Sequence, residues 1–181
     1  MDLRPQDVVV VLKFLASPPK SWTYAELAQE LSMSPSQVFR SVDRAEVAHL
    51  LERSPMPPPS GDYVQPFAPN RANLKEFLVH GVKYAFPVHR GGLVRGKPTA
   101  HAAPPLNEHL AQSFDPPPVW PYAEGSVRGT EFSPLYKNVP AAAQRDPKLY
   151  ELLALVDAIR DGRAREREIA IRELTSRIDS H

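Results

Sequence analysis

Apolar residues dominate two consecutive stretches at the start of the chain, and each stretch carries the signals of a helix. The first, Asp7–Leu15, follows Pro5, which a first helical turn tolerates because its missing amide has no intrahelical partner there. The second, Trp22–Leu31, repeats leucine at helical spacing, and Thr23 and Glu26 stand three residues apart, as in a capping box. The pattern therefore predicts two helices, one from each stretch.

A third helix is predicted directly after a short break. Ser34 is a favourable N-cap, and Pro35 fits the first helical position. The apolar stripe expected to face the core consists of Val38, Val42 and Ala45. The polar side chains expected on the other faces are Ser36, Gln37, Arg40, Ser41 and Arg44.

A short helix that braces a second, polar one is the arrangement that reading the major groove of DNA requires. Glutamine can bond adenine through two hydrogen bonds, arginine can bond guanine, and a helix N-terminus suits a phosphate. The same pattern also fits a plain helical hairpin whose polar face is only solvated. Spacing alone leaves both interpretations open.

The stretch from Tyr24 to Ser41 (YAELAQELSMSPSQVFRS) resembles the winged helix-turn-helix of bacterial transcription regulators of the MarR-like type. Ala48–Leu51 is similar to the place where the recognition helix of that family runs into its first wing strand. The resemblance covers about residues 5–75 and implies binding of duplex DNA, usually as a two-fold dimer. The family often has a small polar residue where this chain has Phe39, and usually a glycine where it has His49.

The two wing strands are expected over Leu50–Ser54 and Tyr63–Phe67, with a proline-rich tip between them. Arg53 and Arg71 are the expected wing contacts to phosphate or to the minor groove, although a solvated strand edge explains them equally well. In the DNA interpretation, Gln37 and Arg40 read bases. The residues expected to contact the DNA backbone are Ser34, Ser36, Ser41, Arg44, Arg53 and Arg71.

The rest of the chain alternates between loop-rich and helical stretches, since 16 of the 21 prolines and 7 of the 8 glycines fall within residues 55–140. The elements predicted there and beyond are a helix over Asn73–Ala85, a strand over Val127–Phe132, a helix from Pro147 to Gly162 and a helix over Arg163–Ile178. Trp120, in an extended proline-rich segment, is expected to pack against its own domain.

Charge is unevenly distributed even though the net charge is only +1. Residues 71–97 carry six Lys or Arg against Glu76 alone, a balance of +5, so a polyanion is expected to be drawn to the middle of the chain. Within that segment, residues 90–99 are expected to form a basic glycine loop that contacts a DNA backbone or an acidic protein, or is purely structural.

Two patterns in the middle of the chain fit catalytic or metal-binding motifs only in part. Gly91, Gly96 and Lys97 have P-loop spacing, but Pro98 stands where a magnesium-binding hydroxyl is needed. His101 and His109, with Glu108, lack a third ligand at metal-motif spacing. No cysteine is present, which excludes disulfides, thiolate metal sites and a cysteine nucleophile. We expect no enzyme activity, no metal and no cofactor.

A second resemblance suggests an alternative function. Phe77–Pro87, Val119–Pro121 and Tyr150–Ala158 are similar to stretches of a group of bacterial winged-helix proteins encoded beside nucleotidyltransferase-type toxins. That resemblance implies an antitoxin-type protein-interaction module that masks a cognate toxin and autoregulates its operon.

These patterns together predict an α+β, mostly helical fold. A winged helix-turn-helix DNA-binding domain is expected over residues 1–75, and a loop-rich, helical C-terminal lobe for dimerisation or partner binding over residues 76–181. We expect a homodimeric transcriptional repressor that binds double-stranded DNA sequence-specifically. A cytoplasmic location without membrane contact is expected, because the first residues lack the features of a signal peptide and no apolar run is longer than the five residues of Val8–Leu12.

Overall fold

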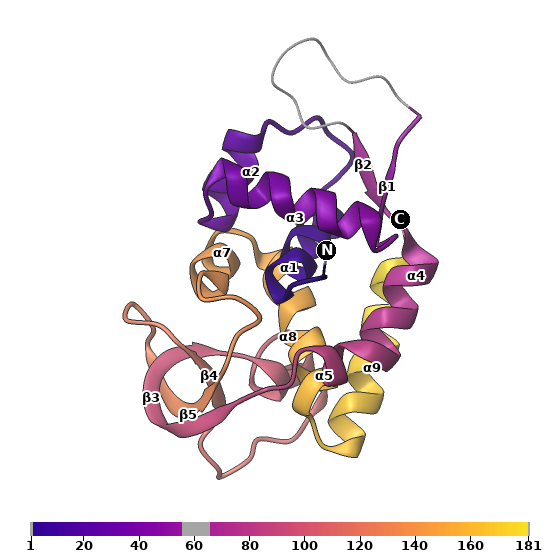
Figure 1. Cartoon of the computed structure of the whole chain (residues 1–181). Coiled ribbons are helices and arrows are strands. Elements are labelled where there is room, and N and C mark those ends of the chain that lie inside the picture. The colour runs from indigo at the N-terminus through magenta and orange to yellow at the C-terminus, as the bar shows by residue number, and fades with distance from the viewer. Residues whose placement is uncertain (1, 56–65, 181) are drawn as a thin grey trace.

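Three helices and a small hairpin form the first part of the chain in the computed structural model, which describes residues 2–55 and 66–180 (Figure 1). These elements are α1 (Pro5–Ala16), α2 (Tyr24–Leu31), α3 (Pro35–Val47), β1 (Leu51–Arg53) and β2 (Phe67–Pro69). Both predicted caps are confirmed. Thr23 accepts a hydrogen bond from the Glu26 amide at 3.1 Å, and Ser34 accepts one from the Gln37 amide at 3.2 Å.

Helix α1 lies at the centre of the molecule, between α3 and α8 (Pro147–Asp161) (Figure 1). Its residues from Val8 to Leu12 are all buried, so every side of the helix contacts protein. A helix that is apolar all round has to be covered on all sides, which explains its central position. The core around it is one continuous cluster that includes side chains from both ends of the chain.

The hairpin is antiparallel, with Leu51 opposite Pro69 and Arg53 opposite Phe67. Its first strand is predicted correctly, but its second strand begins at Phe67, where the predicted strand ends. The other residues of that prediction, 63–65, lie outside the described residues. Before the hairpin, His49 has φ 57°, in the left-handed region that favours glycine. The backbone here has the conformation that a glycine would adopt most easily.

A single bent helix follows the hairpin and consists of α4 (Arg71–Glu76), a π-helical turn η1 (Phe77–Gly81) and α5 (Val82–Ala85). It begins two residues before the predicted helix, because the Asn70 side chain caps it by accepting from the Asn73 amide. The predicted domain boundary, between residues 75 and 76, therefore falls inside one continuous helix.

The proline- and glycine-rich middle of the chain forms a small closed barrel. Its strands are β3 (Arg90–Pro98), β4 (Pro118–Pro121) and β5 (Val127–Phe132), with η2 (Ala100–Ala102) and α6 (Leu106–His109) between β3 and β4. Strand β3 is antiparallel to the other two, and β4 is parallel to β5. The predicted strand over β5 is confirmed, but the predicted loop over residues 90–99 is wrong, since most of it is strand β3.

Glycine lets these strands approach closely. A Cβ at Gly96 would lie 2.0 Å from the Trp120 carbonyl oxygen, and one at Gly129 would lie 2.0 Å from the Pro117 carbonyl oxygen. The glycines that suggest a loop in the sequence are therefore required for the packing of a small barrel.

The last helices are α7 (Val139–Arg145), α8 and α9 (Ala164–Asp179), and the two long ones match the prediction closely. Helix α8 connects the barrel to the core through Asp157, a fully buried carboxylate. Its oxygens accept hydrogen bonds of 2.7 Å from Thr99, from the Trp120 indole and from Arg160. Trp120 is completely buried, so it packs within its own chain as predicted. No helix in the described part of the chain is long and apolar enough to cross a membrane.

Candidate nucleic-acid interface

The outward face of α3 is the part of the molecule on which the predicted base-reading residues lie. Helices α1 and α2 pack against the opposite face and bury Val38, Val42 and Ala45, the three residues predicted to face the core. Ser36, Phe39 and Arg40 are exposed on the first turns of the helix. The buried face of α3 is therefore fixed by α1 and α2, while the outward face of its first turns is exposed to solvent.

Arg40 is the predicted base-reading residue with the most freedom to bind a ligand. It is exposed and forms no ion pair or side-chain hydrogen bond with any residue that the structure describes. Its planar guanidinium group, with five N–H donors, is therefore available to a ligand without competition from a described residue.

Gln37, the other predicted base reader, is already engaged inside the protein. Its side-chain oxygen accepts from the Ser34 amide at 2.9 Å, and its side-chain nitrogen donates to the Tyr136 hydroxyl at 3.0 Å. Ser34 uses its hydroxyl for the helix cap and lies 3.2 Å from the Ser36 hydroxyl. Ser34 and Gln37 therefore cap the start of α3, and Gln37 also links it to Tyr136 in the segment before α7.

Two predicted contact residues are buried, and the prediction that they face solvent is wrong. Ser41 is fully buried and Arg44 is 6% exposed. The Arg44 guanidinium donates two hydrogen bonds, of 2.8 and 2.7 Å, to the Asp7 carboxylate on α1. It also donates to the Ser41 hydroxyl at 3.3 Å. These side chains join α3 to α1 and do not belong to the outer surface.

The two predicted wing arginines lie in different surroundings. Arg53 is exposed on β1 and forms an ion pair with Glu46 of α3. Burial raises the pKa of Tyr24, and the positive charge of the nearby Arg53 opposes part of this increase. Arg71 donates to the Ile178 carbonyl oxygen at the end of α9, so it links the last helix to α4. Of the two, only Arg53 lies beside the exposed face of α3.

Several residues outside the predicted set of DNA contacts also lie on this face. Phe39 is 55% exposed and its ring meets that of Tyr24 edge-on, with centroids 5.6 Å apart. Val47, farther along the helix, is 57% exposed. Asp43 and Glu46 place negative charge on the same helix. Counting helical positions from the buried stripe would place Asp43 and Val47 on this face. A carboxylate and an aliphatic side chain at these positions do not indicate DNA contacts.

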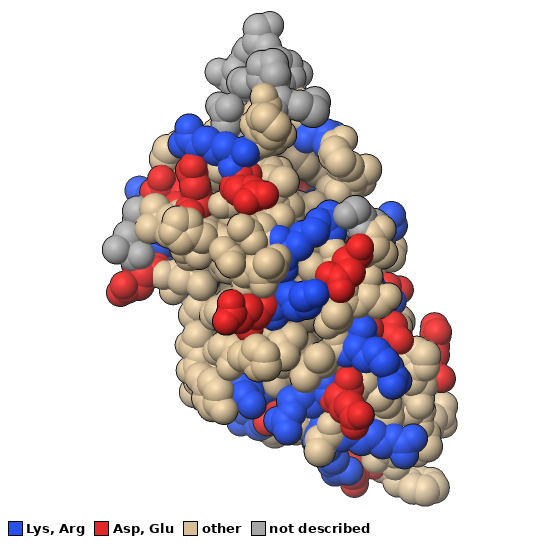
Figure 2. Space-filling view, turned by 90° about the vertical axis from the view of Figure 1, so that its right-hand side faces the viewer, with Lys and Arg blue, Asp and Glu red and all other residues tan. Residues whose placement is uncertain are grey.

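The basic segment of the sequence does not form one basic surface. Arg71 bonds a carbonyl, Lys75 pairs with Asp179 and Arg90 pairs with Asp161. Lys83 lies over the Tyr84 ring, and Lys97 lies over the Tyr150 ring and donates to Gln144. Figure 2 shows basic and acidic side chains interspersed over one face of the molecule, without a large area of either sign.

The partial P-loop and histidine patterns are also accounted for by structure. Gly91, Gly96 and Lys97 all lie in strand β3, where no loop surrounds a phosphate, and burial lowers the pKa of Lys97. His101 and His109 each lie 3.6 Å from a different carboxylate of α9. Among the described residues, no three His, Cys, Asp or Glu side chains gather as a metal site.

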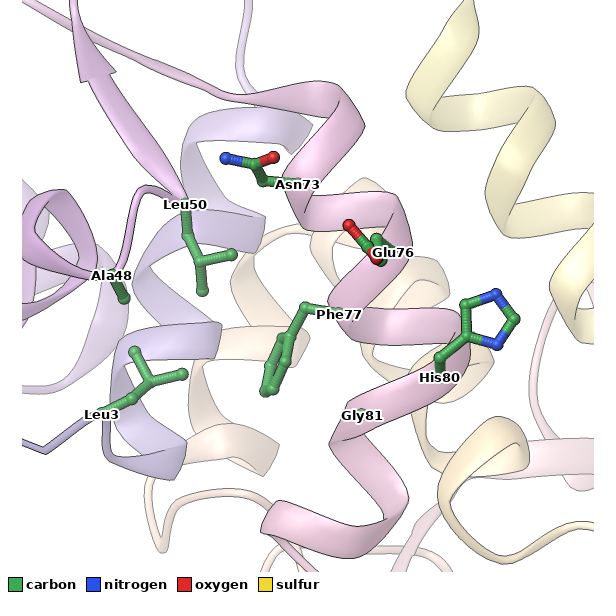
Figure 3. Close-up of a pocket in the computed structure, with 8 residues that line it drawn as sticks. All are labelled: Leu3, Ala48, Leu50, Asn73, Glu76, Phe77, His80 and Gly81. Carbon is green, nitrogen blue, oxygen red and sulfur yellow. The ribbon is translucent and has the colours of Figure 1, made fainter.

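A shallow groove of about 450 Å³ lies behind the end of α3, between α1, β1 and the helix that contains the π turn (Figure 3). Leu3, Leu50 and Phe77 form its apolar floor, while the His80 ring points away from it. The Asn73 side chain donates to the His49 carbonyl oxygen at 3.0 Å. The groove is apolar and open, and it presents no arrangement of reactive groups.

No family model, no curated protein and no solved structure matches this chain.

Proposed function

We propose that this chain binds double-stranded DNA sequence-specifically and acts as a transcriptional regulator, with the outward face of α3 in the major groove. The observation that carries the proposal is Arg40, whose side chain has no partner among the described residues, on the exposed first turns of a helix whose other face is fixed by α1 and α2. Helix α3 has 13 residues and is about 20 Å long, and a helix fits the major groove, which is about 12 Å wide.

The exposed side chains suit separate parts of a DNA site. Arg40 can donate two hydrogen bonds to guanine, and Phe39 offers an apolar ring for the methyl group of thymine. The N-terminal end of α3 suits a phosphate, because the positive end of the helix dipole favours negative charge there. Arg53 can contact the backbone once it exchanges its Glu46 partner for a phosphate.

The acidic residues on α3 bear on specificity. Asp43 and Glu46 repel phosphates, so the face gains little from nonspecific attraction to DNA. Binding must then come mainly from base contacts by α3. We expect weak, salt-sensitive binding to random DNA and much tighter binding to a site that contains the matching guanine and thymine.

The test is selection of a duplex from a random library, followed by fluorescence anisotropy on the selected site. Arg40→Ala is expected to weaken that binding by roughly 1–3 kcal/mol, or about 5- to 150-fold. Arg172→Ala is the matched control, because Arg172 is also an exposed arginine but lies on α9; the affinity of this variant for the selected site should equal that of wild type. Replacing the contacted thymine by uracil removes one methyl group and should weaken wild-type binding but not that of Phe39→Ala.

Two outcomes would refute the proposal. Selection that enriches no duplex would remove DNA binding and favour the protein-interaction alternative. Enrichment with equal affinities for wild type and Arg40→Ala would show that α3 is not the reading element.

A further inference from the structure

Two arginines face each other across neighbouring strands of the barrel. In the antiparallel pairing of β3 with β5, Arg95 is directly opposite Arg128, and Leu93 is opposite Thr130. Side chains directly opposite in such a pair lie on the same face of the sheet, with Cβ atoms about 4.5–5.5 Å apart. Both arginines are exposed. The two positive charges therefore share one patch of surface.

Neither arginine has a counter-ion in the part of the chain that the structure describes. Arg95 is the one Lys or Arg of the basic segment 71–97 whose side chain has no ion pair, hydrogen bond or ring contact with a described residue, and the Arg128 side chain has none either. Glu124, in the turn between β4 and β5, accepts a hydrogen bond from the Tyr122 hydroxyl. Glu131 is an odd number of positions from Arg128 along β5, and so points to the other face of the strand.

This arrangement costs stability in the free protein. Like charges directly opposite each other on paired strands repel, and they destabilise the pairing. The two positions stay opposite each other because both strands belong to one closed barrel, whose backbones pack closely against the β4 segment at Gly96 and Gly129. Strand β4 is in turn fixed by the buried hydrogen bond from Trp120 to Asp157. A bound anion is the simplest way to remove the cost.

We propose that Arg95 and Arg128 together bind a phosphate group. Guanidinium groups bind phosphate oxygens through paired hydrogen bonds, and two of them on a rigid support can hold one phosphate from two sides. The phosphate belongs either to a free phosphorylated molecule or to the backbone of DNA. The site lies on the barrel and does not depend on the base-reading role proposed for α3.

The first experiment measures the Tm of the full chain with sodium pyrophosphate against sodium chloride at equal ionic strength. Wild type should gain roughly 2–4 °C at saturating pyrophosphate. Arg95→Gln and Arg128→Gln should each lose this gain, and should melt above wild type in low-salt chloride because the repulsion is gone. Arg172→Gln, a change of equal charge on α9, should respond as wild type does.

The second experiment separates the two sources of phosphate through the salt dependence of duplex binding. If the phosphate belongs to DNA, the slope of log K against log salt becomes shallower by about 1 for each arginine replaced. If it belongs to a free molecule, the pyrophosphate response is lost in the variants while the slope is unchanged. No pyrophosphate stabilisation of wild type, or equal stabilisation of the Arg95→Gln and Arg128→Gln variants, would overturn the proposal.

Discussion

The buried pair of Arg44 and Asp7 predicts a large and specific loss of stability. Arg44→Met keeps a side chain of similar length but removes the guanidinium. The Asp7 carboxylate is fully buried and would keep only the Arg4 amide, at 2.7 Å, as a hydrogen-bond donor. Removing one partner of a buried ion pair costs about 3–5 kcal/mol, because the other charge stays in an apolar environment without compensation. Since domains are stable by roughly 5–15 kcal/mol, this is a large fraction of the total.

The assay is urea unfolding followed by circular dichroism, with Arg40→Met as the control. Arg40 is exposed and its side chain has no partner in residues 2–55 and 66–180, so that substitution should change the free energy of unfolding by less than about 0.5 kcal/mol. The double variant Asp7→Leu/Arg44→Met should be more stable than Arg44→Met alone, because no buried charge is left without a partner. If Arg44→Met loses less than about 1 kcal/mol, or if the double variant loses the sum of both single changes, Arg44 does not serve as the buried partner of Asp7.

Two further predictions concern α8. Asp157→Ala should destabilise the chain by about 3–5 kcal/mol in the same urea assay, since it leaves the buried Trp120 indole without its acceptor and the buried Arg160 cation without its carboxylate partner, with backbone carbonyls such as that of Phe86 as its remaining acceptors. Asp161→Ala, which breaks an exposed pair, should cost less than about 1 kcal/mol, and equal losses would contradict the reasoning. Burial raises the pKa of Tyr150 to about 12 from its ordinary value near 10, so its contribution to stability is present below pH 10 and is lost as the pH rises towards 12. Ultraviolet titration of tyrosinate should show a step near pH 12 that Tyr150→Phe removes; a step that survives in this variant belongs to another residue.

The sequence predicts the elements that depend on neighbouring residues. The capping box at Thr23, the N-cap at Ser34 and the stripe on α3 are local patterns, and the structure confirms them. The long helices α8 and α9 follow from the same helical periodicity.

What the sequence does not reveal depends on residues far apart in the chain. Arg44 looks like a solvent-exposed arginine because its partner, Asp7, is 37 positions away. Asp157 likewise looks like an ordinary acidic residue in the sequence, because its hydrogen-bond donors Thr99 and Trp120 are 58 and 37 positions away. Strand β3 contains glycine and proline, which usually indicate a loop, and only pairing with β5 makes it a strand.

The same non-local contacts separate structural from exposed residues on α3. Arg40 and Arg44 are four positions apart and of one residue type, yet Arg40 is exposed and Arg44 is buried. Helical spacing alone places both outside the apolar stripe. Only the packing of α1 against α3 distinguishes them.

The central position of α1 has a consequence for how a signal would travel through the molecule. The buried Lys13 on this helix bonds Glu30 of α2 at 3.0 Å and Asp146, the N-cap of α8, at 2.7 Å. The two ends of the chain thus share one internal helix. Because α1 packs against both α3 and α8, a change that loosens the packing at one end of the chain is expected to loosen it at the other. Hydrogen exchange of the α1 amides would record that coupling directly, because these amides open only when the shared core opens.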